Sequence, residues 1–327
     1  MTKDEIKILI LRRLYEIVFR GGREGFVNIR KFSESNEIDP ELAFKVVDEM
    51  KGLGFIETEC SGGTYEFNSA ALLYCEEQKL ADPKLFDYQN KVRKILLLTL
   101  ADMQENSPSG EGVYWQEWIQ KAGVNDQDFT NNHKIMQSMN LIREESSSEY
   151  FITPHGKSTV QDYRKRKKRL EDFERLEKLE AVTEQQRGHK LEDLLANTAE
   201  WEGWDVKRRV RAQGQENDII MHVGLHYFLN SCKWEAEPIH GKEVELLESR
   251  VRSRAQTNGG ILFSMSGFTP NCIEEIRLKI ATALIIPFGP GDIRRIMQNE
   301  ATMTDLLDDK IDYIMNHRKI HVNGELK

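Results

Sequence analysis

Apolar residues in the first part of the chain recur at helical spacing and then give way to short alternating runs. Residues 5–19 carry a helical stripe of Ile, Leu and Val, and a short helical stretch follows near 29–32. The triplet Asp39-Pro40-Glu41 begins a third helix, because Asp caps free N–H groups and Pro fits the first turn. Residues 55–58 and 64–67 then alternate like two strands of a hairpin.

The same order returns in the next stretch of sequence. Helical patterns cover 95–103, 115–119 and 127–139, and strand-like runs at 141–143 and 150–152 flank a polar turn. Three helices and a hairpin, found twice, resemble tandem winged-helix domains. The resemblance implies one such domain over residues 1–80 and a second over 88–160.

Residues 161–187 are highly charged and contain no internal Gly or Pro, which predicts a solvated connector helix that Gly188 ends. The pattern then changes to that of an α/β domain over 188–327. Its expected elements are a helix over 189–201, strands near Trp204, Ile219, Phe228 and Leu262, an apolar run at 283–286, and a last helix over 306–315. The chain is therefore expected to be multidomain.

The net charge of −8 is unevenly distributed, since residues 1–156 hold 18 basic against 26 acidic residues. The connector is positive, with six successive basic residues: Arg164, Lys165, Arg166, Lys167, Lys168 and Arg169. A helix spreads six residues over all its sides, so a solvated segment balanced by acids at 171–177 is one interpretation. Contact with nucleic-acid phosphates is the interpretation that we favour.

Four cysteines show no CxxC spacing, so neither a disulfide framework nor a structural zinc site is indicated. No run of about 18 apolar residues would span a membrane, and the first residues show no apolar signal-peptide segment. We therefore expect a cytoplasmic protein with no membrane partner.

The stretch from Gly214 to Trp234 is the most informative. It contains Gly214-Gln215-Glu216-Asn217-Asp218-Ile219, a hairpin, and Asn230-Ser231-Cys232-Lys233-Trp234. The first fragment matches a G-x-E-x-D-I pattern and the second ends in the expected lysine. Together with Glu192 on the preceding helix and the strand around Leu262, this order resembles the PD-(D/E)xK restriction-endonuclease-like superfamily, in its Mrr-type branch. The resemblance implies an α/β fold with a central mixed sheet.

That resemblance also implies a chemistry. Phosphodiester hydrolysis needs a divalent cation, Mg²⁺ or Mn²⁺, to offset phosphoryl charge and lower the pKa of bound water. By the family pattern Asp218 would bind the metal, the backbone carbonyl of Cys232 would be another ligand, and Glu192 would join them. Lys233 would orient the water and stabilise developing negative charge.

Ser231 departs from the family pattern, which places an acidic residue or Gln two positions before the lysine. A serine hydroxyl brings no charge to hold Mg²⁺. Glu192 would compensate, or Glu235, which alternation puts on the face of Lys233 if the strand continues that far. Without such compensation the fold would be retained in a catalytically impaired pseudonuclease.

The two N-terminal repeats differ in what they offer a partner. The third helix of the first carries Glu41, Asp48 and Glu49, which favours contact with a protein over base readout. The corresponding helix of the second, with Asn131 and Lys134 among its polar residues, is the better DNA candidate. We expect a DNA endonuclease of restriction or defence type, with RNA as partner and a homodimer left open. The alternatives are the pseudonuclease and a winged-helix regulator that binds DNA without cutting.

Overall fold

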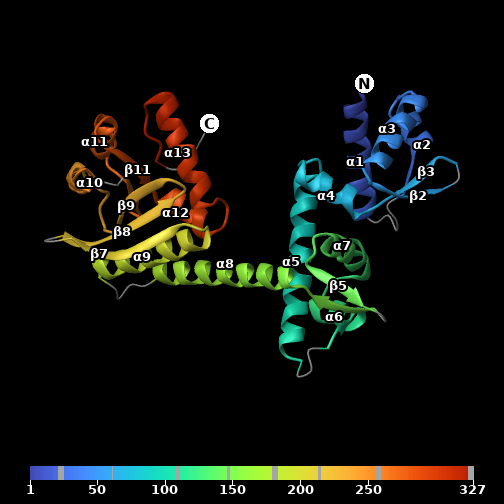
Figure 1. Ribbon diagram of the computed structural model, residues 1–327, viewed down its shortest axis with the longest axis horizontal. Coiled ribbons are helices and arrows are strands. Elements are labelled where there is room, and N and C mark those ends of the chain that lie inside the picture. Colours follow the sequence, from blue (N-terminus) through green and yellow to red (C-terminus); the bar gives the residue numbers. More distant parts are fainter. Residues whose placement is uncertain are drawn as a thin grey trace. The chain divides into compact units, whose positions relative to one another are not determined.

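The computed structural model describes residues 1–20, 26–60, 62–107, 111–145, 148–178, 183–212, 215–254 and 259–322, with only the backbone at 209–212 and 215–218. The chain divides into two compact units, Met1–Tyr163 and Arg164–Lys327, whose boundary falls within helix α8, Pro154–Lys178. None of the helices in the described ranges combines the length and apolar character needed to cross a membrane. Figure 1 labels most of the elements of each unit.

The first half of unit 1 follows the order helix, strand, helix, helix, hairpin, helix. Its elements are α1 (Lys3–Phe19), β1 (Phe26–Asn28), α2 (Ile29–Ser35), α3 (Pro40–Gly52), β2 (Ile56–Cys60), β3 (Thr64–Phe67) and α4 (Ser69–Glu77). The strands form a three-stranded sheet in the order β1-β3-β2. Asp39 accepts a hydrogen bond from Glu41 N–H at 3.1 Å, as a helix cap should. The predicted order is present, with a short strand and a helix added.

The second half of unit 1 repeats that order. It contains α5 (Pro83–Glu105), β4 (Val113–Tyr114), α6 (Trp115–Ala122), α7 (Asp126–Ser138), β5 (Ile142–Glu145) and β6 (Glu149–Ile152). Its sheet has the order β4-β6-β5, equivalent to that of the first half. Trp118 is fully buried at its centre and donates from its indole N–H to the Leu96 carbonyl at 2.8 Å.

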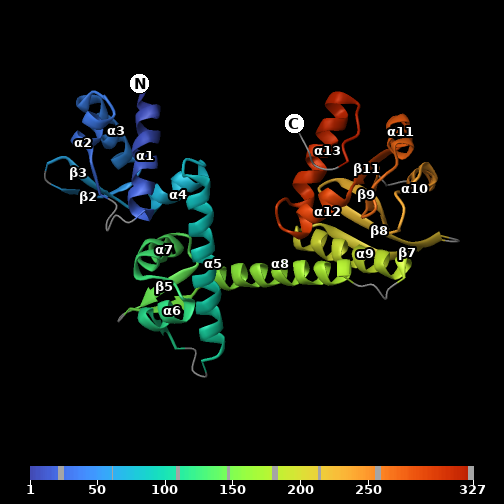
Figure 2. The same cartoon turned by 180° about the vertical axis from the view of Figure 1, so that it is seen from behind.

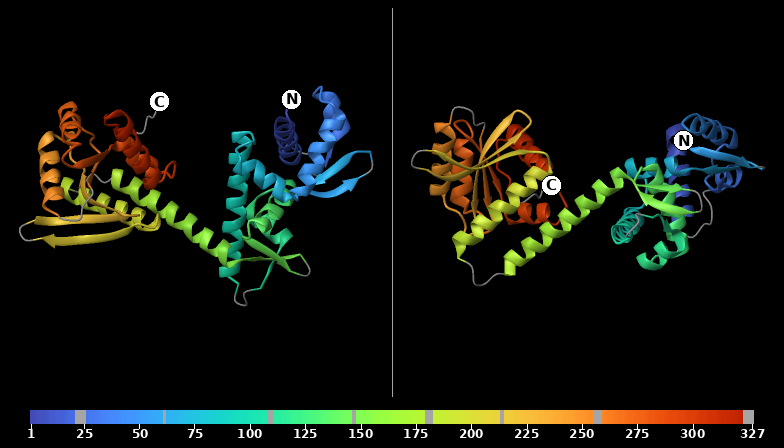
Figure 3. Two further views of the ribbon diagram at one scale, coloured as in Figure 1. Left: turned by 45° about the horizontal axis from the view of Figure 1, so that its top comes forward. Right: turned by 60° about the horizontal axis from the view of Figure 1, so that its bottom comes forward.

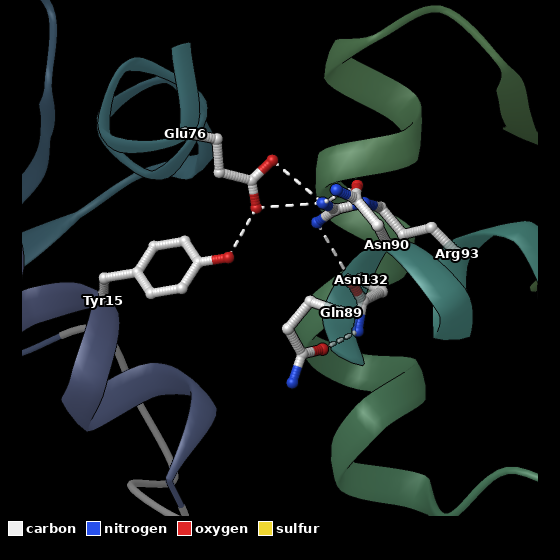
Figure 4. Close-up of polar contacts among 6 residues, drawn as sticks. All are labelled: Tyr15, Glu76, Gln89, Asn90, Arg93 and Asn132. Atoms are coloured by element: carbon white, nitrogen blue, oxygen red, sulfur yellow. Dashed lines mark hydrogen bonds and ion pairs between the residues drawn. The ribbon is translucent and has the colours of Figure 1, made fainter. Parts of the chain in front are cut away.

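A buried polar network joins the two halves of unit 1 (Figure 4). Arg93 of α5 donates to both carboxylate oxygens of Glu76 of α4 at 2.9 Å, and both side chains are less than a tenth exposed. Tyr15 donates to Glu76 at 2.7 Å, and Arg93 also donates to Asn132 of α7 at 3.2 Å. A charge pair buried with its hydrogen bonds satisfied holds its surroundings in one arrangement.

Unit 2 is built on a five-stranded mixed sheet in the order β11-β10-β9-β8-β7. Its strands are β7 (Asp205–Ala212), β8 (Gln215–Val223), β9 (His226–Lys233), β10 (Gly259–Ser264) and β11 (Leu284–Phe288). Strand β8 runs antiparallel to both β7 and β9, whereas β9, β10 and β11 are parallel to one another. This confirms the predicted α/β arrangement with a central mixed sheet.

Helices cover both faces of this sheet, as Figures 1 and 3 show. On one face, α9 (Glu184–Trp201), α12 (Pro290–Met297) and α13 (Met303–His317) pack with strand residues such as Phe228 and Phe263. On the other, α10 (Gly241–Ser253) and α11 (Pro270–Lys279) pack with Leu229 and Leu262. Neighbouring strand residues thus enter opposite cores, as strand alternation requires. Figure 2 shows the same helices from behind.

The predicted end of the connector helix is wrong. Helix α8 ends at Lys178, and α9 begins at Glu184 behind the N-cap Thr183, so Gly188 lies inside a helix. Thr183 and Gln186 form a reciprocal capping box, in which each side chain accepts from the other residue's backbone N–H at 3.3 Å. A glycine inside a helix destabilises it by about 1 kcal/mol. The capping box satisfies two N–H groups at the start of α9, and this stabilisation outweighs the cost of Gly188.

Candidate functional site

The site predicted around Lys233 lies where β8 stops pairing with β9. The pairs between β8 and β9 end at Ile219 and Asn230, whereas those between β9 and β10 continue to Lys233 and Ser264. Residues 231–233 are therefore held on their β10 side. Their other edge faces a cavity.

That cavity measures about 610 Å³ and gathers most of the predicted site. Its lining includes Glu192, Ser231, Cys232 and Lys233, together with residues of α10. The backbone of Asp218 belongs to β8, one residue beyond the last pair with β9. Its side chain lies outside the described part of the chain, so the expected meeting of Asp218 and Lys233 stays a prediction.

Two carboxylates surround the Lys233 ammonium group. Its Nζ lies 3.3 Å from Glu243 Oε2 and 3.6 Å from Glu235 Oε1. Glu235 does reach the lysine, although β9 ends at Lys233 and does not continue as a strand. The sequence prediction missed Glu243, which lies ten residues away in the first turn of α10. The local sequence indicates only that a helix begins at His240-Gly241. It does not indicate that this helix packs beside Lys233.

Glu192 approaches the cavity from the opposite layer. It lies on α9 and is mostly buried. Its Oε2 atom lies 3.4 Å from His189 Nδ1, within reach of a hydrogen bond. Burial, and then the negative charge of Glu192, raise the pKa of the Cys232 thiol well above its usual range. Cys232 is thus a neutral thiol, and Glu192 flanks β9 on the side opposite Glu243.

The Cys232 carbonyl faces the open edge of β9. Met265 N–H donates to the Lys233 carbonyl at 3.1 Å, so that group is used by the segment following β10. Carbonyls alternate along a strand, which turns the preceding one the other way. A Cβ built on Gly188 would lie 3.9 Å from this Cys232 oxygen, so the glycine of α9 leaves open space beside it.

The donor chemistry around the cavity fits a hard divalent cation. Carboxylates and one backbone carbonyl are the oxygen ligands that Mg²⁺ prefers. Asn230 is 2% exposed and lines the cavity, and its Oδ1 has no hydrogen-bond partner among the described residues. The side chains described do not bring three Asp, Glu, His or Cys residues into one cluster. A complete ligand set would therefore need Asp218 as well.

Two residues predicted to contact nucleic acid are engaged inside the protein. Arg169 is 6% exposed and donates to the Ile296 carbonyl at 2.9 Å and to Asn299 Oδ1. Asn131 donates to the Val18 carbonyl at 2.7 Å and accepts from Gln127 at 2.9 Å. These two are not available to a phosphate or a base.

The other basic residues of the run stay at the surface. Arg164, Lys165, Arg166, Lys167 and Lys168 are exposed on α8, as is Lys134 on α7. Helix α7 is packed on more than one side, because its Ile135 enters the core of the first half of unit 1 while Met136 enters that of the second. A helix buried in this way has little free surface to place in a major groove.

Comparisons with known proteins add little to this geometry. No family model and no curated protein sequence matches the chain. The restriction endonuclease FokI bound to DNA aligns over 83% of this chain and 60% of that one, at 11% identity and a TM-score of 0.26. A second FokI structure aligns over 82% and 60%, at 10% identity and 0.29. The chain thus spans about 60% of FokI, and likeness at these TM-scores carries no argument.

Proposed function

We propose that this protein is a divalent-metal-dependent DNA endonuclease of the restriction-endonuclease-like, Mrr type, and that its unit 1 is a tandem winged-helix targeting module. The observation that carries the proposal is the strand register in unit 2. Ile219 pairs with Asn230, so Asp218 and Ser231 are the next positions on adjacent strands, and Lys233 follows two residues later. Ser231 and Lys233 line the cavity, and the backbone of Asp218 lies where β8 and β9 part, which supports an arrangement that brings an acid and an ammonium group to one phosphodiester.

The chain's own residues divide the work as follows. Asp218, Glu192 and the Cys232 carbonyl would hold Mg²⁺ or Mn²⁺, which offsets phosphoryl charge and lowers the pKa of bound water. Lys233 donates hydrogen bonds to the attacking water or to the phosphoryl oxygens and stabilises the negative charge that develops there. The carboxylates of Glu243 and Glu235 lie within ion-pair distance of its ammonium group and fix its position.

DNA is the partner that this reaction requires. Exposed basic residues on α8 provide contacts with DNA phosphates that do not depend on the DNA sequence. They are Lys165, Arg166, Lys167 and Lys168, and Lys134 on α7 adds a further contact. Residues 1–156 carry the excess of acidic residues, and helix α3 exposes Asp48 and Glu49. The first half of unit 1, which contains α3, is therefore better suited to a protein partner or a second copy of the chain than to DNA.

The direct test is metal-dependent nicking of supercoiled plasmid. We expect the full chain to nick DNA with Mg²⁺ or Mn²⁺ and to stop with EDTA. Asp218→Ala and Lys233→Ala should each reduce the rate at least about 100-fold, the scale on which removing a charge stabiliser of the transition state acts. Lys242→Ala, an exposed lysine on α10, is the matched control and should cut normally. Equal nicking by all four proteins would reject the assigned roles.

A pseudonuclease that binds nucleic acid or a protein without cutting is the second candidate. It is favoured by the neutral Ser231 and by the two carboxylates that already neutralise Lys233. Calorimetric titration with Mn²⁺ separates the candidates, because a cleaving site must bind metal and the Asp218→Ala variant must lose that binding. DNA binding without metal binding would favour the pseudonuclease.

A further inference from the structure

We infer that the groove between α1 and α2, in the first half of unit 1, is a docking site for an acidic amphipathic helix of a partner protein. The groove is a cavity of about 570 Å³ lined by residues of α1, β1 and α2. It belongs to unit 1, whereas the cavity around Lys233 belongs to unit 2, so the inference goes beyond DNA cleavage and does not depend on it. The occupant follows from the apolar lining, the charge and the amide groups of this groove.

The apolar lining of the groove comes from all three elements. Val27 of β1 and Phe32 of α2 line it and are buried. Leu9 and Ile17 of α1 also line it and are only partly buried. They lie eight residues apart on one face of α1, with Arg13 between them, and are therefore about 12 Å apart along the helix axis. That length accepts about two turns of another helix, whose apolar side chains would cover Leu9 and Ile17.

The described residues that line the groove carry a positive charge. Its cations are Arg12, Arg13 and Lys31, and its one carboxylate is that of Glu16. The lining therefore has two net positive charges. Residues 1–156 as a whole hold 18 basic against 26 acidic residues, so the groove has the opposite sign from the sequence around it. A positive potential of this kind steers an acidic partner to the groove.

Two of these cations have no ion-pair partner among the residues that the structure describes. Arg13 lies 3.5 Å from the Glu16 carboxylate, but neither Arg12 nor Lys31 pairs with a described carboxylate. Both side chains are exposed. Carboxylates along the edges of a bound helix would therefore reach them while the apolar side of that helix enters the groove.

The amide side chains of the groove already serve the fold. Asn28 accepts from Lys31 N–H at 3.0 Å and donates to Thr64 Oγ1 at 2.9 Å. Asn36 donates to the Phe32 carbonyl at 2.8 Å. The groove therefore offers a partner chiefly apolar surface and positive charge.

This combination favours a protein over nucleic acid. A DNA backbone would meet the cations but would leave the apolar lining uncovered. A lone anion beside two exposed side chains would stay hydrated and screened by salt. An acidic amphipathic helix satisfies both features, because burial of its apolar face supplies affinity and its carboxylates fix its position.

Fluorescence anisotropy with the full chain and a fluorescein-labelled synthetic peptide tests the inference. The probe is a helix of about 15 residues with leucines at i, i+3, i+4 and i+7 and glutamates elsewhere. One comparison peptide has lysines in place of the glutamates, and another has alanines in place of the leucines. We expect the wild type to bind the probe at least about tenfold more tightly than either comparison peptide, because each lacks one of the two kinds of contact.

Charge reversal in the groove locates the binding. Arg12→Glu and Lys31→Glu should each weaken binding of the probe by at least about fivefold, since each changes the charge of the groove by two. Lys45→Glu makes the same change at an exposed lysine of α3 outside the groove. It is the matched control and should stay within about twofold of the wild type. Thermal unfolding of the three variants should match that of the wild type, because all three side chains are exposed.

Every other occupant gives a different result. Failure of the probe to bind, equal binding of either comparison peptide, or an equal loss in Lys45→Glu would overturn the inference. If Arg12→Glu and Lys31→Glu lose affinity for duplex DNA but keep the probe, the groove contacts nucleic acid and the inference is wrong. If sedimentation shows that the chain self-associates through these residues and the probe does not compete, the occupant is a second copy, which also overturns it. The assays contain no divalent cation, so their outcome is separate from that of the nuclease proposal.

Discussion

The Glu76–Arg93 pair gives the sharpest test of how unit 1 is held together. In the variant Glu76→Gln, the Arg93 guanidinium keeps its charge but loses its only buried counter-charge among the described residues. Arg93 is 5% exposed, so water cannot take the place of the carboxylate. Its remaining partners are the neutral side-chain oxygens of Asn90 and Asn132, at 2.7 and 3.2 Å.

The size of the effect follows from burial. Removing one member of a buried ion pair typically costs 3–5 kcal/mol, because the other charge is left uncompensated. Gln keeps one oxygen that can accept from Tyr15 or Arg93, so we expect about 3 kcal/mol, the lower end. The contact joins α4 to α5, and the loss should therefore be felt in both halves of unit 1.

Hydrogen exchange read by mass spectrometry is the suitable assay, since a chain of two units need not unfold in one step. Protection in peptides from α4 and α5 should fall by about 100-fold, the equivalent of about 3 kcal/mol at 1.4 kcal/mol per tenfold. Glu49→Gln is the matched control, because its partner Lys3 is a surface lysine 2.5 Å away and both side chains are about half exposed. Such a pair is worth less than about 1 kcal/mol. Equal losses in the two variants would refute the reasoning.

Three further predictions address other parts of the chain. Gly188→Ala should stabilise α9 by up to about 1 kcal/mol in thermal unfolding, because alanine favours a helix more than glycine does. The new methyl carbon would lie 3.9 Å from the Cys232 carbonyl oxygen, so it fits but narrows the space beside that oxygen. We therefore expect the same variant to bind Mn²⁺ more weakly in calorimetry. Arg169→Met should cost about 1–3 kcal/mol in denaturant unfolding, because the Ile296 carbonyl and the Asn299 side-chain oxygen each lose the hydrogen bond that Arg169 donates. Lys168→Met should instead stay within about 0.5 kcal/mol and weaken DNA binding in a salt titration. Burial and the negative charge of Glu76 raise the pKa of Tyr15 above its ordinary 10.0. The contribution of the protonated Tyr15 to the free energy of unfolding is therefore fully present below pH 10 and is lost as the pH rises above that value. Tyr15→Phe should remove this alkaline loss when the free energy of unfolding is measured against pH.

Much of the fold could be predicted because its signals are local. The strands around Ile219, Phe228 and Leu262 are short apolar runs between turns, and each formed where the pattern placed it. The same rules, applied consistently, would also have found the start of α5. Its Asp82-Pro83 repeats the cap of Asp39-Pro40, and Asp82 accepts from Lys84 N–H at 3.0 Å. The break assigned to Gly188 failed because the capping box at Thr183 was overlooked.

The fate of individual polar residues could not be predicted, because it depends on contacts far apart in sequence. Arg169 belongs to a run of six basic residues, yet its partners Ile296 and Asn299 lie more than 120 positions away. Asn131 is bound by the Val18 carbonyl, 113 positions away. A local pattern gives the charge of a side chain but not which side of a helix becomes buried.

The charges that line the cavity lead to an order of binding. Among the described lining residues, the carboxylates of Glu184, Glu192, Glu235 and Glu243 outnumber the cations Lys233 and Arg250 by two negative charges, with His189 left out of the count. Such a surface repels DNA phosphates until a divalent cation is bound. We therefore expect Ca²⁺, which binds oxygen ligands, to tighten DNA binding by the full chain in fluorescence anisotropy, and Asp218→Ala to lose this stimulation. If the protein binds DNA equally well with Ca²⁺ and without any divalent cation, phosphates do not enter this cavity. The DNA contact would then lie elsewhere on the protein.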